Sequence, residues 1–201
     1  MSDCGCKIEI KNREESRVLV ALLGINLLMF FIEISFGILA ESNALIADSL
    51  DMLADASVYG IGLYAVGKSA LMKVTAARIS GILQITLGLT VAADAIRRFV
   101  FGSDPESVLM ISVGILALIA NLTCLRLIAG HREGEIHMRA SWLFSKNDVI
   151  ANLGIILGGG LVYIFDSRYP DIVTGLIISA IVARGGLHIL QDAKRESHAR
   201  R

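Results

Sequence analysis

Six long runs of apolar residues alternate with short polar breaks along the 201 residues of the chain. A helix needs about 20 mostly apolar residues to cross the hydrocarbon core of a bilayer, and every run is long enough. Charged residues or turn formers interrupt the runs, as from Gly102 to Pro105. The pattern therefore predicts an all-α membrane protein with six transmembrane helices, near 17–40, 43–67, 74–99, 106–129, 139–164 and 171–192.

Short polar segments flank this predicted membrane domain. We expect residues 1–16 to be a cytosolic N-terminal tail, 17–192 the transmembrane domain, and 193–201 a cytosolic C-terminal tail. Basic residues gather at the helix ends on the side of the two tails, and the opposite ends carry few. Because Lys and Arg accumulate on the cytoplasmic side of membrane helices, both termini are predicted to be cytoplasmic.

The composition agrees with a lipid environment, since 54% of the residues are hydrophobic and only 19% are charged. Lys plus Arg and Asp plus Glu balance at 19 each, so the net charge indicates no nucleic-acid partner. Three cysteines are too few for a disulfide framework. The first apolar run follows a polar segment and is long enough to remain as an anchor, so no cleavable signal peptide is expected.

Three carboxylates in the second run are the main chemical signal in the sequence. Asp48, Asp51 and Asp55 are three and four positions apart, which places them on one face of a helix. An ionised side chain in the membrane core costs roughly 2.5 to 3.5 kcal/mol on insertion scales. Like charges this close cannot all stay ionised in a low dielectric without a cation, so a divalent ion or exchanging protons are expected there. Asp48 alternatively serves as a structural acceptor near the helix start.

The fifth run carries a second group of oxygen-bearing side chains. Asp148 and Asn152 are four residues apart and share a helix face, with Asn147 on the adjacent flank. These side chains are candidate metal ligands together with the aspartates of the second run. The alternative for the two asparagines is hydrogen bonding between helices, which is common for amides within membranes.

Weaker signals lie in the first, third and fourth runs. Glu33 is a candidate member of a proton or ion path. Asp94 is expected to pair with Arg97 and Arg98, which follow it by three and four positions. Cys124 is either a metal ligand or a small apolar filler.

The second and fifth runs resemble the cation diffusion facilitator family of metal transporters. The segment from Ser42 to Asp55 is similar to that family's S-x-A-L-x-A-D-x-x-H/D-x-x-x-D stretch, and Arg139 to Asp148 is similar to its R-A-x-x-x-H-x-x-x-D helix. The resemblance implies that Asp51, Asp55 and Asp148 are three of the four ligands of a transport site between the second and fifth helices.

Two departures from the family pattern change what is expected. Phe144 stands where the family has a His or Asp, so Asn147, Asn152, Ser145 or water would complete the site. The chain also resembles a short form without the C-terminal cytosolic domain, so a homodimer would form through membrane helices. An all-oxygen site favours harder ions such as manganese over an imidazole-containing site, while zinc, cadmium, cobalt and iron follow from the resemblance.

The expected function is proton-coupled efflux of a divalent metal cation by a multi-pass protein of the bacterial inner (cell) membrane. Its partners would be the transported ion, protons and lipid, and no permanently bound cofactor is expected. The rival hypothesis is a non-transporting membrane interaction or metal-sensing subunit with a degenerate site. An enzyme is not expected, because neither His-Glu-x-x-His nor Gly-x-Ser-x-Gly occurs in the sequence.

Overall fold

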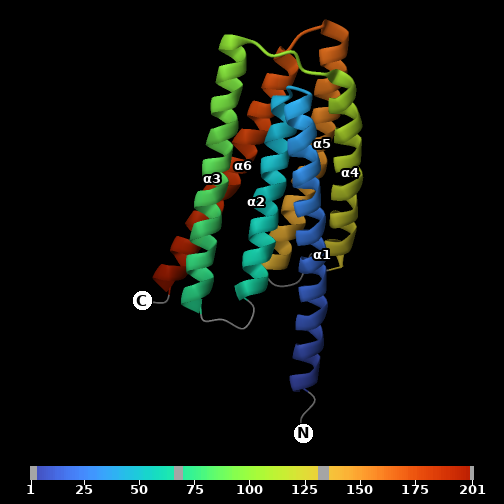
Figure 1. Ribbon diagram of the computed structural model, residues 1–201. Helices are drawn as coiled ribbons and strands as arrows, with labels where there is room; N and C mark the ends of the chain where they lie inside the picture. The colour runs from blue at the N-terminus through green and yellow to red at the C-terminus, as the bar shows by residue number, and fades with distance from the viewer. Residues whose placement is uncertain (1–3, 66–69, 131–135, 200–201) are drawn as a thin grey trace.

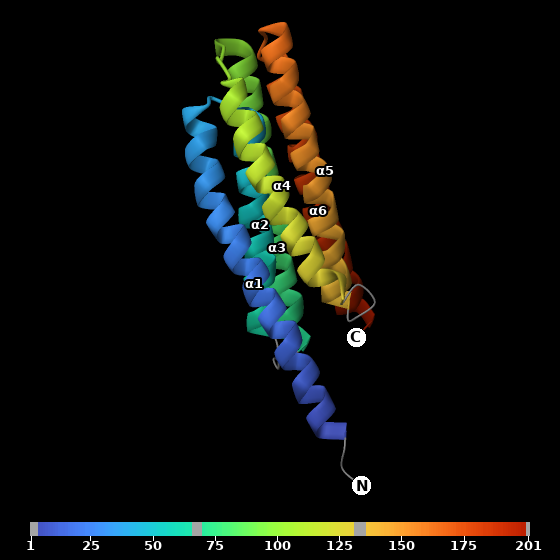
Figure 2. The same cartoon turned by 90° about the vertical axis from the view of Figure 1, so that its right-hand side faces the viewer.

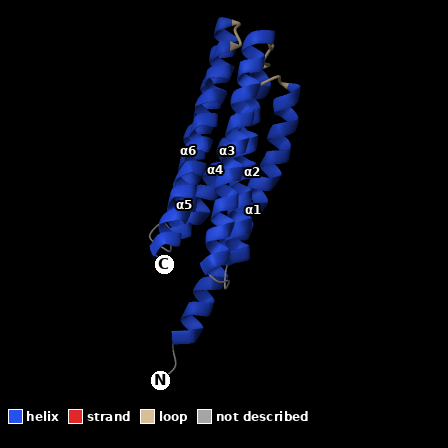
Figure 3. Cartoon of the chain, turned by 90° about the vertical axis from the view of Figure 1, so that its left-hand side faces the viewer, coloured by secondary structure: helices blue, strands red, loops and turns tan. Residues whose placement is uncertain are grey.

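The computed structural model describes residues 4–65, 70–130 and 136–199, which form an all-helical bundle (Figure 1). No strand occurs among these residues, as the secondary-structure colouring of Figure 3 shows. Successive helices run up and down, so α1 begins and α6 ends on the same side of the bundle. The helices of this described part are α1 (Cys4–Leu39), α2 (Asn43–Ala65), α3 (Ala70–Phe101), α4 (Ser107–Ala129), α5 (Ile136–Phe165) and α6 (Tyr169–Ala199).

Within the described residues, five helices contain segments long and apolar enough to cross a membrane. Their large hydrophobic side chains cover the outside of the bundle, as expected for a surface in contact with lipid. The chain is therefore a multi-pass membrane protein, and the predicted all-α fold is confirmed. The five segments are Ser16–Leu39, Ala77–Phe101, Ser107–Ala129, Ser145–Phe165 and Tyr169–Arg195.

The first and last helices extend beyond the predicted apolar spans. The helix α1 begins at Cys4, and its first turns project past the other helices (Figure 2). Residues 7–15 contain neither Gly nor Pro, so nothing in this polar segment stops the helix. At the other terminus α6 continues to Ala199 for the same reason. The segments predicted as tails are thus largely helical, and the side chains of Cys4 and Cys6 lie outside the described residues.

The acid-bearing helix α2 occupies the centre of the bundle. It contacts each of the other five helices that the structure describes, while α3 pairs with α6 and α4 pairs with α5. Figure 2 shows α4 between α1 and α5, with α2 behind it. Protein therefore surrounds α2 on several sides, which allows a helix with three carboxylates to lie among membrane-spanning helices.

Small residues bring α3 and α6 into backbone contact. A Cβ atom built on Gly186 would lie 2.6 Å from the carbonyl oxygen of Gly81, and one on Gly88 would lie 2.9 Å from the carbonyl oxygen of Ser179. The hydroxyl of Ser179 in turn donates a hydrogen bond of 3.0 Å to the carbonyl of Gly88. Such close approach is typical of packed membrane helices. There the hydrophobic effect does not hold helices together, and small residues allow close van der Waals packing instead.

A carboxylate of α6 fixes the N-terminus of α2. Asp171 accepts hydrogen bonds from the Ser42 hydroxyl at 2.6 Å and from the backbone N–H groups of Asn43 at 2.7 Å and Ala44 at 3.0 Å. The side-chain amide of Asn43 then donates to Asp94 of α3 at 3.0 Å. Because the first N–H groups of a helix lack partners within it, this Asp171 cap satisfies α2 and links it to two neighbours.

The close approach of α3 and α6 predicts opposite effects for two Gly→Ala changes. Gly186→Ala places its methyl group against the Gly81 carbonyl and should cost about 1–3 kcal/mol. Gly160→Ala is the matched control, since no atom lies within 4 Å of its added Cβ, and it should be neutral or stabilising by about 0.5–1 kcal/mol. Thermal unfolding in detergent measures both, and equal midpoints would contradict the packing described.

Candidate metal centre

The three aspartates of α2 point into the bundle from one helix face. Asp48 is 0% exposed and Asp55 is 2% exposed, while Asp51 is partly buried. The spacing of three and four residues places them in successive turns. The acidic face expected from the sequence is therefore directed toward the interior of the bundle.

Helix α5 brings one further carboxylate toward this face. Asp148 is 6% exposed and interacts electrostatically with Asp55, Asp51 and Asp48 across the contact between α2 and α5. Asn152 is 0% exposed on the same side of α5. Asn147, by contrast, lies on the exposed surface of α5 and is not brought together with the aspartates.

Hydrogen bonds hold two of these groups in fixed orientations. The hydroxyl of Tyr59 donates to Oδ2 of Asp55 at 3.0 Å. The Nδ2 of Asn152 donates to the backbone carbonyl of Asp148 at 2.8 Å, so its Oδ1 remains buried without a partner. The hydroxyl of Ser145 is buried beside that of Tyr59. Acceptor oxygens therefore outnumber the donors available to them here.

Glu33 of α1 adds a carboxyl group that faces Asp48. Both residues are fully buried, and no N–H or hydroxyl group donates to any of their four carboxyl oxygens. The two groups lie next to one another, and Glu33 also interacts electrostatically with Asp51 and Asp148. Two carboxyl groups in contact and away from water require a proton or a cation between them. The acidic interior is therefore larger than the α2 stripe alone.

The carboxylates face a common interior without converging on one point. Among the described residues, no group of three His, Cys, Asp or Glu side chains is positioned to hold a metal ion. Mutual repulsion between unliganded carboxylates opposes convergence, so a bound cation would have to draw them together. Phe144 belongs to α5, but its side chain lies outside the described residues.

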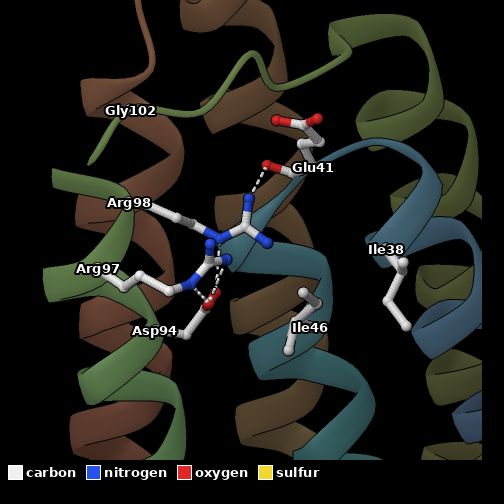
Figure 4. Close-up of a pocket in the computed structure, with 7 residues that line it drawn as sticks. All are labelled: Ile38, Glu41, Ile46, Asp94, Arg97, Arg98 and Gly102. Atoms are coloured by element: carbon white, nitrogen blue, oxygen red, sulfur yellow. Dashed lines mark hydrogen bonds and ion pairs between the residues drawn. The ribbon is translucent and has the colours of Figure 1, made fainter. Parts of the chain in front are cut away.

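The far end of the bundle contains carboxylates whose charge is already compensated. Asp94 accepts from Arg97 at 2.7 and 2.9 Å and also from Arg98, which confirms the predicted pairing of this aspartate. Arg98 additionally donates to the backbone carbonyl of Glu41. These groups line a cavity of about 420 Å³, and Figure 4 shows both guanidinium groups directed at Asp94. The carboxylate of Asp94 is thus paired with donors, unlike those of Glu33 and Asp48.

Two residues of the interior were missed by the sequence reasoning. Tyr59 follows Asp55 by four positions, so helical spacing was the available signal for its role. Asn26 of α1 is buried, and its amide donates to the backbone carbonyl of Leu22 and to the sulfur of Cys124. Its partner lies 98 positions away in the sequence, so no local pattern indicated that contact.

A multi-pass helical bundle with buried carboxyl groups has the features of membrane proteins that bind or move ions and protons. Residues 19–196 match the family model described as the cation efflux transmembrane domain. The match covers most of the chain, so the chain belongs to the cation efflux family, whose members are transporters rather than enzymes. The predicted family and the expectation that the chain is not an enzyme are both confirmed.

Several bacterial transporters are similar to this chain. A cadmium, cobalt and zinc/H(+)-K(+) antiporter of Bacillus velezensis is 26% identical over 81% of this chain and 56% of its own length. The zinc transporter ZitB of Escherichia coli is 26% identical over 90% of this chain and 62% of its own length. The metal cation efflux system protein CzcD of Cupriavidus metallidurans is 22% identical over 83% and 56%, respectively. The chain thus spans less than two thirds of each of these relatives.

The hydrogen bond from Tyr59 to Asp55 predicts a positioning role for the tyrosine. Tyr59→Phe removes the donor and keeps the ring, so Cd²⁺ binding through Asp55, the ligand expected from the sequence, should weaken by about 10- to 100-fold. Equilibrium dialysis of the detergent-solubilised chain measures the affinity. Tyr163→Phe is the control, because that side chain is 74% exposed and should have no effect. Unchanged affinity in Tyr59→Phe would contradict the positioning role.

Proposed function

We propose that this chain carries divalent metal cations out of the cytoplasm in exchange for protons. The observation that supports the proposal most strongly is the set of buried carboxyl groups on α1, α2 and α5, several of whose oxygens have no donor. A cation neutralises these groups in one state of the cycle, and protons neutralise them in the other. The family match supports a metal ion as that cation.

Asp51, Asp55 and Asp148 are the proposed ligands of the transported ion. They come from the two helices that carry the family resemblance, and each interacts electrostatically with another of the three. Asn152 is the proposed amide ligand, since its Oδ1 is buried and free of donors. Asp48 and Glu33 lie at the next turn of this interior and are proposed to take protons or to pass the ion onward. Asn147 is left out because its side chain is exposed.

We further propose that α2 is the sixth membrane span and that both termini are cytoplasmic. The contacts of α2 with all the other described helices support a position within the bundle, despite its three carboxylates. The excess of basic residues on the side of the termini supports the orientation. The bacterial relatives support placement in the bacterial inner membrane. A homodimer would rest on the apolar outer faces of the helices, where many large hydrophobic side chains are exposed.

The transported ion is proposed to be zinc, cadmium or cobalt, because the names of the relatives contain these metals. Manganese and iron remain part of the test, since oxygen ligands alone select weakly among such ions. In the proposed cycle a cytoplasmic metal ion displaces protons from the carboxyl groups. A rocking motion of the helices then exposes the site to the opposite side, where protons release the ion.

Flux measurements on reconstituted vesicles test the proposed function. An acidic vesicle interior should drive uptake of Zn²⁺, Cd²⁺ or Co²⁺, followed with an internal metal-sensitive dye. Asp51→Ala, Asp55→Ala and Asp148→Ala should each reduce uptake to that of protein-free vesicles, because each removes a charged ligand. Asp104→Ala, at an exposed loop position, should leave it unchanged. Absence of pH-driven flux for zinc, cadmium, cobalt, manganese and iron, with the fold intact, would reject the proposal.

The rival function is a non-transporting membrane interaction or metal-sensing subunit with a degenerate site. Phe144 favours it, because a phenyl ring offers no ligand atom at a position where the family has one. Direct titration of the purified chain separates the two. A transporter should bind metal stoichiometrically and lose that binding in Asp148→Ala. A degenerate site should show no binding that depends on Asp148.

A further inference from the structure

Cys124 lies on α4 in the interior, beside the acidic residues of α2 and α5. Its side chain is 0% exposed and packs in a cluster with Leu19, Leu22 and Tyr59. Tyr59 is the residue whose hydroxyl holds Asp55. The thiol also interacts electrostatically with Asp148 and Asp55. The only cysteine among the residues whose side chains are described is therefore adjacent to the proposed transport site.

An amide group contacts this thiol within an otherwise largely apolar cluster, and a second buried amide lies on the same helix face. The Nδ2 of Asn26 donates to Cys124 Sγ at 3.8 Å, and the Oδ1 of the same amide is buried without a partner. Asn121 lies three positions before Cys124 on the buried face of α4, and neither atom of its amide has a partner. Burying amide groups unsatisfied is costly, so their presence here indicates a ligand that they are placed to meet.

We propose that the Cys124 thiolate is a ligand of the transported metal ion, together with Asp55 and Asp148, and that Asn26 orients its sulfur. The proposal rests on the proposed function and adds a ligand from α4 to those from α2 and α5. On binding, the thiol releases its proton, the sulfur–metal bond forms, and that proton joins those exchanged for the ion. The thiolate is a further ligand beside the proposed Asp51 and Asn152, and it offers the ligand atom that Phe144 lacks.

A sulfur ligand changes which ions the site prefers. Thiolate is a soft ligand that selects zinc and cadmium, whereas an all-oxygen site suits manganese and magnesium. A preference for zinc and cadmium would therefore come from Cys124 on α4. Since the three side chains are not yet within bonding distance of one point, binding must draw α4 toward α2 and α5.

X-ray absorption at the zinc edge tests the proposal on the full chain in detergent. The Cys4→Ser/Cys6→Ser double variant is loaded with one equivalent of Zn²⁺, which leaves Cys124 as the only cysteine. One sulfur ligand at about 2.3 Å is expected. A first shell of oxygen and nitrogen alone would overturn the inference while leaving metal binding, and hence the proposed function, intact. Failure to bind zinc at all would count against both.

Cys124→Ser in the same background gives the matched selectivity measurement. Serine keeps the shape and a hydrogen-bonding atom but replaces the soft ligand by a hard one. Cd²⁺ affinity should fall at least tenfold while Mn²⁺ affinity stays within twofold, and the near-ultraviolet absorption from sulfur-to-cadmium charge transfer should disappear. An unchanged ratio of Cd²⁺ to Mn²⁺ affinity, with the thermal midpoint preserved, would contradict the assignment. The zinc-edge result decides the question if the serine variant does not fold.

Discussion

Burying carboxyl groups within a membrane is the constraint on which this architecture depends. Each ionised group at the membrane core carries a cost of roughly 2.5 to 3.5 kcal/mol, so a helix with three of them is poorly suited to face lipid. The fold meets this constraint by placing α2 in contact with every other described helix. Burial among helices does not remove the repulsion between the carboxylates, so protons or a cation must neutralise their charge.

The two polar regions of the bundle handle charge in different ways. At the end where α2 begins, Asp171 receives three donors and Asp94 is paired with two arginines, so both carboxylates are fully partnered. In the interior, Glu33 and Asp48 face one another, and no other group donates a hydrogen bond to either. Compensated groups fasten α2 to α3 and α6, whereas uncompensated groups are suited to exchange protons for a metal ion. Stability and function are thus assigned to different regions of the same central helix.

The nature of the transported ion depends on which atoms complete the acidic site. Carboxylates and the Asn152 amide alone would make a hard site of low selectivity, as the sequence suggested. The proposed thiolate ligand at Cys124 would make the same site softer, in keeping with the zinc and cadmium named for the relatives. Under this proposal, the selectivity of the chain would depend on α4, a helix outside the two motifs that resemble the family.

The sequence by itself determined the number and approximate position of the helices, because hydrophobic run length is a local property tied to membrane thickness. It also placed Asp48, Asp51 and Asp55 on one face and paired Asp94 with Arg97 and Arg98, since spacings of three and four are fixed by helix geometry. Only the tertiary structure separated exposed Asn147 from buried Asn152, set Glu33 against Asp48, and brought Asn26 to Cys124. It also capped α2 with Asp171, a contact across 128 positions. These contacts depend on the register between helices, which is decided by packing of side chains distant in the sequence.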